Sequence, residues 1–285
     1  MCGKIICVVL WAVASLCGIV PGERDSLLVV SWNVENFLDY RTDSTGRYTK
    51  SRFYTKCNSI AKTLLLIADR EGRVPDAVAL MEVGDRFVLD RLLSQTPLRK
   101  LGYKIVHYDS PDRRGIDCAL LWRENNLSLK CSSPCHIKDA GGAVMATRDI
   151  LLAEFDWLDI LVNHHPSKVG PDSERRRSIA MWRMRSLMDS LAAAGHGRVL
   201  SVGDFNDDVW GGGAARGTIK YNGAWEKIDG HFASDSLKVR EIVFEAPCLM
   251  EKDRAFGGVK PLRSYSGPRF LGGPSDHLPV ILWIR

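Results

Sequence analysis

The chain has 285 residues, of which 45% are hydrophobic and 26% are charged. This length is enough to bury a complete core, and the even composition favours one large domain over two small ones. The net charge of +5 becomes +4 when residues 1–22, which hold Lys4 and no acid, are set aside. So small a positive charge is compatible with an anionic substrate but does not require one.

Residues 1–22 have the layout of an export signal. Lys4 precedes an apolar stretch over residues 5–20, and Pro21 and Gly22 follow it. We therefore expect a signal peptide over residues 1–22, a secreted or periplasmic protein, and a single domain over residues 23–285. An uncleaved membrane anchor is the alternative, because the stretch is only slightly shorter than a bilayer span. A lipid on Cys17 is disfavoured, because Leu16 is large where a small residue is expected.

Five cysteines remain beyond residue 22, and an odd number excludes complete pairing in disulfides within the chain. Cys131 and Cys135 flank a short Ser-Ser-Pro segment, predicted to be a loop, where they could pair in an oxidising compartment. Cys118 lies in an apolar run and is expected to be a buried thiol. No Cys/His spacing is typical of a zinc site.

Beyond residue 26 the pattern alternates short apolar strands with amphipathic helices. In chain order it predicts strand 27–32, helix 52–70, strand 77–81, short helix 88–93, strands 116–122, 150–155 and 158–162, helix 174–194, and strands 199–202, 242–244 and 280–284. Gly195 marks the end of the long helix. Because most connections are too short for helical crossovers, we expect two mixed sheets flanked by helices rather than a doubly wound parallel sheet.

Polar side chains follow several of these apolar segments, where a rigid sheet can position them. A cluster of Glu, Asp and Asn without cysteine offers hard oxygen ligands, which favours Mg²⁺, Mn²⁺ or Ca²⁺ over zinc or copper. In chain order the candidates are Asn33 with Glu35, Glu82, His164 with His165, Asp204 with Asn206, Asp229, and Asp276 with His277.

Glu82 is the strongest candidate metal ligand. It follows the apolar run 77–81 directly, where an unpaired carboxylate would carry a large desolvation cost. A salt bridge to an arginine such as Arg86 is the alternative. Asn33 and Glu35 alternate on one strand end, so both are expected on one face that can share the cation. Taken alone, the pair could equally cap a helix that starts near Phe37.

Asp204 and Asn206 come two residues apart after a glycine. They predict either a carboxylate that orients or deprotonates a water together with an amide that donates to phosphate, or a simple Asx turn. His277 is a candidate base or phosphate ligand, and Asp229 is the candidate carboxylate that fixes its tautomer. Only one of His164 and His165 is expected to face the site, and His164 is preferred.

Several basic and aromatic residues are candidates for substrate binding. A solvated helix start is the preferred reading of Arg175–Arg177, and no element is typical of base recognition. The candidates for phosphate contact are Arg113, Arg114, Arg175, Arg176, Arg177, Lys220 and Arg263, and those for stacking on a base are Tyr221 and Tyr265.

Taken in order, these motifs resemble the endonuclease/exonuclease/phosphatase superfamily, which includes pancreatic deoxyribonuclease. The resemblance covers residues 27–285 and is closest to exported bacterial members with no settled substrate. Its markers are Trp-Asn-Val-Glu-Asn from residue 32, the glutamate after the apolar strand, Asn-His-His-Pro-Ser from 163, Gly-Asp-Phe-Asn from 203, Lys-Ile-Asp from 227 and Ser-Asp-His-Leu-Pro-Val from 275.

The resemblance implies an α+β fold, a four-layer sandwich of two packed mixed β-sheets with helices outside and an active site built from loops at one edge. It implies a metal set of Asn33, Glu35, Glu82 and Asp276, with Asp276 also supporting His277. The catalytic groups would be Asp204 and Asn206 for water and phosphate, Asp229 to orient His277, and His164 to stabilise the phosphorus centre or the leaving group. Either Asp204 or His277 would take the water's proton. The substrate would contact Arg114, Asn206, Arg263 and Tyr265.

We therefore expect a Mg²⁺-dependent phosphoester hydrolase, with a nuclease or other phosphodiesterase favoured. A phosphatase or a lipid phosphodiesterase is the runner-up. A catalytically silent secreted binding module is the alternative from another class. A glycosidase is disfavoured, because the histidines and asparagines would then have no task. The expected form is a monomer, with a phosphoester or nucleic acid as its partner.

Overall fold

The computed structural model describes residues 26–208 and 217–285. The predicted signal peptide, with its alternatives of a membrane anchor and a lipid on Cys17, lies outside the described residues. Within the described ranges no helix is both long and apolar enough to cross a membrane.

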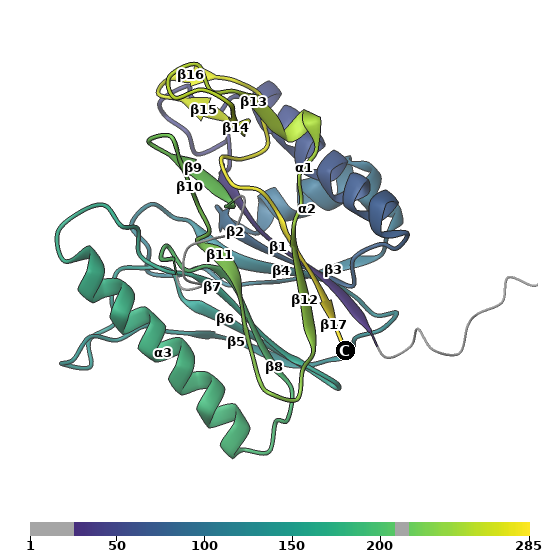
Figure 1. Cartoon of the computed structure of the whole chain (residues 1–285), viewed down its shortest axis with the longest axis vertical. Helices are drawn as coiled ribbons and strands as arrows, with labels where there is room; N and C mark the ends of the chain where they lie inside the picture. The colour runs from purple at the N-terminus through teal and green to yellow at the C-terminus, as the bar shows by residue number, and fades with distance from the viewer. Residues whose placement is uncertain (1–25, 209–216) are drawn as a thin grey trace, which may run out of the picture.

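Two mixed β-sheets form the centre of the molecule (Figure 1). The first is β12 (Val239–Val243), β17 (Val280–Ile284), β1 (Leu27–Phe37), β2 (Ala77–Val83), β4 (Asp117–Arg123) and β3 (Tyr103–His107), in spatial order. The second is β11 (Asp229–Ala233), β8 (Val199–Asp204), β7 (Asp159–His164), β6 (Ile150–Phe155) and β5 (Leu129–Cys135). The pairs β1–β2 and β7–β8 are parallel, and the other neighbours are antiparallel.

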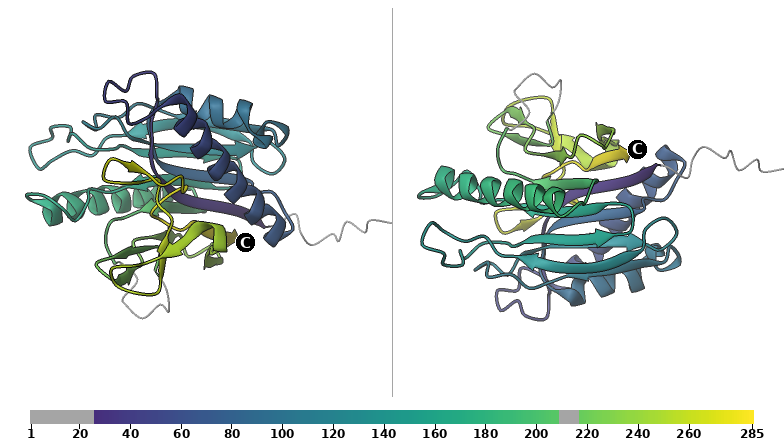
Figure 2. Two further views of the ribbon diagram at one scale, coloured as in Figure 1. Left: turned by 90° about the horizontal axis from the view of Figure 1, so that it is seen from above. Right: turned by 90° about the horizontal axis from the view of Figure 1, so that it is seen from below.

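Helices cover the outer face of each sheet, as the two turned views in Figure 2 show. Helices α1 (Lys50–Glu71) and α2 (Arg86–Gln95) lie on the first sheet, and α3 (Ser173–Ala193) lies on the second. The predicted four-layer sandwich is confirmed.

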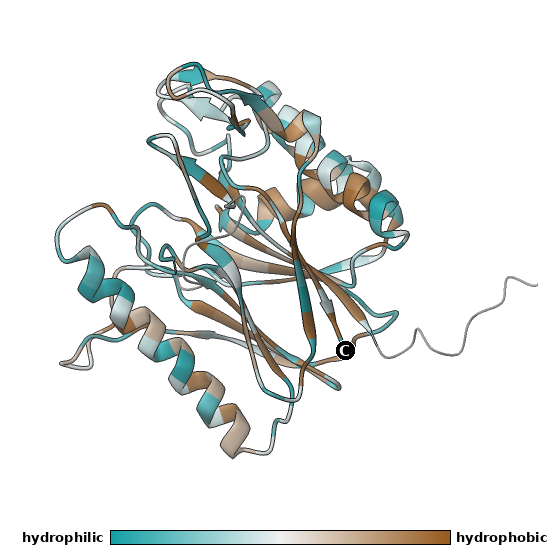
Figure 3. Cartoon of the chain, viewed as in Figure 1, coloured by the Kyte–Doolittle hydropathy of each residue, from teal (hydrophilic) through white to brown (hydrophobic). Residues whose placement is uncertain are grey.

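Strand β1 is apolar at successive positions because both of its faces are covered. Leu28 and Val30 belong to the core beneath α1 and α2, whereas Leu27 and Val29 belong to the core between the two sheets. In Figure 3 the apolar residues accordingly gather along the central strands.

The predicted helices are present with slightly different bounds, which their caps explain. Thr49 accepts a hydrogen bond from the backbone amide of Arg52 at the start of α1, and Gly72 takes the left-handed conformation at its end. Asp85 caps α2 in the same way, so this helix begins before the expected Val88.

Several strands were not predicted, and they are short, polar or at sheet edges. They are β3, β5 and β11 in the large sheets, and the small hairpin strands β9 (Ile219–Tyr221), β10 (Ala224–Glu226), β13 (Met250–Lys252), β14 (Val259–Pro261), β15 (Tyr265–Ser266) and β16 (Arg269–Phe270), with 3-10 turns at Pro97–Lys100 and Pro247–Leu249.

The expected loop between Cys131 and Cys135 is wrong, because both residues lie on the edge strand β5. Four residues along a strand span roughly 13 Å, well beyond the reach of a disulfide. Both cysteines are free thiols, and Cys118 is buried as expected.

Gly203 in β8 is required by the close approach of β7. Its φ is 147°, and a Cβ atom there would lie 2.0 Å from the carbonyl oxygen of Asn163. We therefore expect Gly203→Ala to lower the free energy of unfolding by about 3 kcal/mol through strain and overpacking. Urea unfolding measures this loss. Gly197→Ala, which has nothing within 4 Å of the added Cβ, is the control, and equal values for the two variants would contradict the close approach.

Candidate active site

Side chains from the ends of four strands meet at one edge of the sandwich. Asn33 of β1 donates from Nδ2 to Oδ2 of Asp204 of β8, at 3.0 Å. The Nε2 atom of His164 of β7 lies 3.6 Å from that oxygen and 3.9 Å from Oε1 of Glu82 of β2. Because β1–β2 and β7–β8 are parallel pairs, the carboxyl ends within each pair lie at the same edge. These four predicted residues therefore form one cluster that bridges the two sheets.

His277 joins this cluster from the loop before β17. Its Nδ1 atom lies 2.9 Å from Oδ2 of Asp229, and its Nε2 atom lies 4.0 Å from Oδ2 of Asp204. The indole nitrogen of Trp32 donates to the carbonyl of His277, and the hydroxyl of Thr218 donates to Asp229. The ring is thus held from one side by Asp229, and its other nitrogen faces the cluster.

The two site histidines have opposite proton affinities. Burial lowers the pKa of His164 well below its usual value, and the neighbouring Arg148 and Arg114 lower it further. Burial also opposes the charge on His277, but the carboxylates of Asp229 and Asp204 outweigh it and raise its pKa well above the usual value. The surroundings therefore favour the neutral form of His164 and the protonated form of His277.

Burial and the nearby Asp229 raise the pKa of Asp204 to about 7. Its two carboxylate oxygens have different tasks, because Oδ1 accepts from the backbone amide of Asn206 while Oδ2 faces Asn33, His164 and His277. The carboxylate is consequently fixed in orientation by the turn that follows β8.

Glu82 is held in an uncommon conformation, with φ 63° where β2 shifts register against its neighbours. Its Oε2 atom accepts from the backbone amide of Asn36 at 2.7 Å, and its Oε1 atom lies 3.1 Å from a guanidinium nitrogen of Arg114. Although burial raises the pKa of Glu82, these contacts outweigh it and lower the value. The alternative partner Arg86 is wrong, because it pairs with Asp90.

The donor set around Glu82 fits a divalent cation. A buried carboxylate needs positive charge, and in this structure Arg114 supplies it from a side chain that is 53% exposed. The carboxylate oxygens of Glu82 are ligands of the hard type that Mg²⁺ prefers, as is the amide oxygen of Asn33, which in this structure accepts from the backbone amide of Glu35.

Asn33 and Glu35 do not share one set of contacts, because the strict alternation of the strand breaks after Asn33. The register shifts between Asn33 and Phe37, and Glu35 has φ 47°. The Glu35 carboxylate accepts from the backbone amide of Ser264 at 2.6 Å and lies 3.5 Å from Arg263. Asn33 therefore contacts Asp204, whereas Glu35 contacts Ser264 and Arg263.

Asp276 and Arg263 form an ion pair at the rim of the site. Oδ2 of Asp276 lies 2.7 Å from Arg263, and Oδ1 lies 4.0 Å from Nε2 of His277. Asp276 therefore lies beside His277, as expected, while Arg263 neutralises it.

Of the paired histidines, His165 points away from the cluster. Its ring packs edge-on against Phe205, with centroids 5.1 Å apart, and burial lowers its pKa to about 3. Its carbonyl accepts from Nδ2 of Asn206 at 2.9 Å, which leaves the second amide hydrogen of Asn206 for a ligand.

A cavity of about 680 Å³ lies beside the cluster, with five arginines among its lining residues. Two come from the loop before β4, one from the segment before β6 and two from the start of α3, where Arg175 is exposed as expected for a solvated helix start. The five are Arg113, Arg114, Arg148, Arg175 and Arg176.

Sequence reasoning missed Arg148 and Thr218. The buried Arg148 donates to the carbonyls of His164 and His165 and pairs with Asp112, so it braces the end of β7. Its only sequence signal is a charged residue two positions before an apolar strand. Thr218 carries no signal, because its role depends on contact with Asp229.

Other substrate candidates are placed elsewhere or are occupied. Tyr265 is 4% exposed and packs against Tyr48 and Phe270, so its predicted stacking on a base is wrong. Lys220 pairs with Asp253. Of the remaining candidates, Tyr221 is exposed. Arg177 donates to the carbonyl of Ser167.

Solved structures with this fold include three different proteins. The catalytic domain of human Nocturnin, solved with a bound sulfate anion, aligns at 17% identity and TM-score 0.60, covering 92% of this chain and 93% of that one. A mannosyl-6-phosphatase of Bacteroides thetaiotaomicron aligns at 17% identity and TM-score 0.60, covering 91% and 99%. Truncated TDP2 of Caenorhabditis elegans aligns at 16% identity and TM-score 0.57, covering 91% and 97%.

The sequence comparison is more specific. A search of curated proteins gave no significant match. Residues 29–213 match the model of the Endonuclease/Exonuclease/phosphatase family, and this segment includes Asn33, Glu82, His164 and Asp204. The chain therefore belongs to the endonuclease/exonuclease/phosphatase family of phosphoester hydrolases.

Proposed function

We propose that this protein is a divalent-metal-dependent phosphodiesterase that cleaves its substrate by in-line attack of water on phosphorus. The observation that carries the proposal is the position of Asp204, whose Oδ2 atom faces Asn33, His164 and His277 at once. One buried carboxylate between an amide and two imidazoles is suited to handling a water and a phosphate together.

Glu82 and Asn33 would hold the cation, which when bound neutralises charge that develops on the phosphate oxygens. Asp204 accepts the proton of the attacking water, whose oxygen forms the new bond to phosphorus while the ester oxygen leaves with its bonding electrons. Nε2 of the protonated His277 donates to a non-bridging phosphate oxygen. Asp229 keeps that ring in place through Nδ1.

The cavity beside the cluster supports a substrate with further negative charge next to the scissile phosphate. Arginine binds phosphate with a planar set of donors, and four arginine side chains besides the buried Arg148 line this one cavity. A nucleic acid or nucleotide diester meets this requirement. A compact phosphomonoester is the second candidate, because the cavity is large enough for a small molecule.

We expect Arg175→Ala to raise KM by about 3–10-fold with little change in kcat, because it removes an exposed contact to a remote anionic group. Steady-state kinetics on the substrate that is hydrolysed fastest measures the changes in KM and kcat separately. Arg254→Ala, an exposed arginine outside the cavity lining, is the matched control. A fall in kcat with constant KM would contradict a binding role.

The proposed activity is tested by incubating the full chain and its His277→Ala variant with DNA, RNA, sphingomyelin, phosphoinositides, phosphorylated sugars and a chromogenic phosphodiester, with and without Mg²⁺. We expect Mg²⁺-dependent hydrolysis of at least one diester by the unaltered protein alone. Equal turnover by both proteins would end the assignment of the site, and hydrolysis of monoesters only would favour the phosphatase.

We also propose that residues 1–22 direct export and that the mature enzyme is a monomer. Amino-terminal sequencing of the protein recovered outside the cytoplasm should begin near residue 23, and light scattering should give the mass of one chain.

A further inference from the structure

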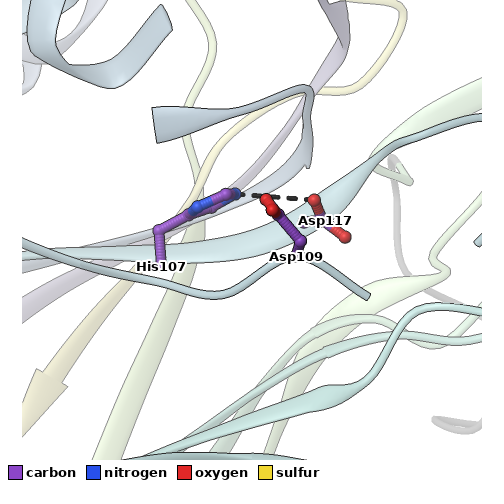
Figure 4. Close-up of side chains that lie close together, drawn as sticks. All are labelled: His107, Asp109 and Asp117. Atoms are coloured by element: carbon purple, nitrogen blue, oxygen red, sulfur yellow. Dashed lines mark ion pairs between the residues drawn. The ribbon is translucent and has the colours of Figure 1, made fainter. Parts of the chain in front are cut away.

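We infer that His107, Asp109 and Asp117 form a second cation site, separate from the cluster around Asp204. His107 ends β3, Asp109 follows two residues later, and Asp117 begins the neighbouring strand β4. One atom of each residue lies within 4.8 Å of the corresponding atoms of the other two. Figure 4 shows the His107 ring pointing toward both carboxylates.

The strand pairing explains why the three side chains meet. His107 lies directly opposite Ala119 in the antiparallel β3–β4 pair. Asp117 is two residues before Ala119, so it is on the same face as His107 and diagonal to it, within reach of a long side chain.

The His107 ring has an unpartnered nitrogen aimed into this cluster. Its side chain is only 2% exposed, and Nε2 has no hydrogen-bond partner among the described residues. This atom lies 3.5 Å from Oδ2 of Asp117. Buried polar atoms normally have partners, so an unpaired nitrogen beside a carboxylate indicates a missing ligand.

Asp117 also keeps one oxygen for such a ligand. Its Oδ1 atom accepts from the amide and the hydroxyl of Ser110, while Oδ2 faces the ring. The two carboxylates bring negative charge to the site, which a divalent cation would balance. The imidazole favours a first-row transition metal such as Zn²⁺ over Ca²⁺ or Mg²⁺.

A comparable group at Glu154, Asp159 and His196 lacks this feature. There Nδ1 of His196 already lies 2.6 Å from Asp159, so the ring has a partner. The His107 group differs because its buried Nε2 atom makes no hydrogen bond among the described residues and lies 3.5 Å from Oδ2 of Asp117.

A cation bound at this site would restrain the loop at residues 108–116. Its ligands come from both ends of that loop, and the loop carries Arg113 and Arg114 to the cavity and to Glu82. A cation bound there would tie the two ends together and hold the arginines in place. The inference itself does not rest on the proposed function.

The test is a Zn²⁺ titration of the full chain by calorimetry with Mg²⁺ in excess, followed by the same titration of His107→Gln, Asp109→Asn and the control His196→Gln. We expect the two site variants to bind Zn²⁺ about 10–100-fold more weakly, with the control unchanged. Because Asp109 is exposed, we expect Asp109→Asn to remain folded. This variant therefore tests the site even if His107→Gln does not fold.

Limited trypsin digestion gives a second readout of the same site. Zn²⁺ should slow cleavage after Arg113 and Arg114 in the unaltered protein and should have no effect in Asp109→Asn. Absence of a Zn²⁺ site in the unaltered protein, or unchanged affinity in Asp109→Asn, would overturn the inference.

Discussion

Replacing His277 by alanine is expected to lower kcat for phosphoester hydrolysis by about 10²–10⁴-fold, with a smaller change in KM. The ring is buried, its Nδ1 is bound by Asp229 and its Nε2 faces Asp204. The variant therefore removes a positive donor that acts on charge formed in the transition state. Steady-state kinetics at saturating Mg²⁺ measures the effect.

The matched control is His136→Ala, because His136 also pairs with a carboxylate, Asp149, at 2.9 Å but lies outside the cluster. It should retain the activity of the unaltered protein. Asp229→Asn should reproduce a large part of the loss, since it removes the carboxylate that holds the His277 ring and raises its pKa. If both histidine variants kept full activity, His277 would have no catalytic role.

Glu82→Gln is expected to lower kcat/KM by about 10³-fold and to raise the Mg²⁺ concentration needed for half-maximal activity. A metal ion contributes several kcal/mol to stabilising the transition state, and this carboxylate is the main charged ligand proposed for it. The amide keeps the shape of the side chain but loses the charge. A Mg²⁺ titration of the initial rate separates weaker metal binding from a slower chemical step.

Glu241→Gln is the control for removing a buried glutamate. Glu241 lies on β12, where it contacts His231 and Lys227 rather than the active site. We expect its variant to lose stability while its Mg²⁺ dependence stays unchanged. An unchanged Mg²⁺ requirement in Glu82→Gln would contradict the assignment of Glu82 as a metal ligand.

The sequence predicted those helices and strands that are buried along their whole length, because burial gives them a regular pattern of apolar residues. Helix α1 was recognisable because Ile60, Leu64 and Ile67 repeat at helical spacing and all three are buried. Strand β5 was missed because it is an edge strand whose residues include Ser132, Ser133 and Pro134, a composition more typical of a loop.

The candidate site was recognisable wherever a polar residue directly ended an apolar strand, as at Glu82 and Asp204. It was not recognisable where the position of a side chain depends on a local irregularity. The shift of register after Asn33 turns Glu35 toward Arg263, and no periodicity reveals such a shift.

Contacts between distant segments were beyond the reach of the sequence. Arg114 rather than the nearby Arg86 meets Glu82, because β2 pairs with β4 and the loop before β4 returns to the end of β2. The burial of Tyr265 likewise follows from the small hairpin β15–β16, which places it against Phe270.

The most direct test of the proposed centre is diffraction from crystals soaked in Mn²⁺, with the anomalous signal locating each bound ion. We predict a peak within coordinating distance of the Glu82 carboxylate and the Asn33 amide oxygen, which disappears in crystals of Glu82→Gln. If Mn²⁺-soaked crystals showed no ion beside Glu82 and Asn33 while the protein still hydrolysed phosphoesters in solution, a metal-bearing centre at this edge of the sandwich would be contradicted.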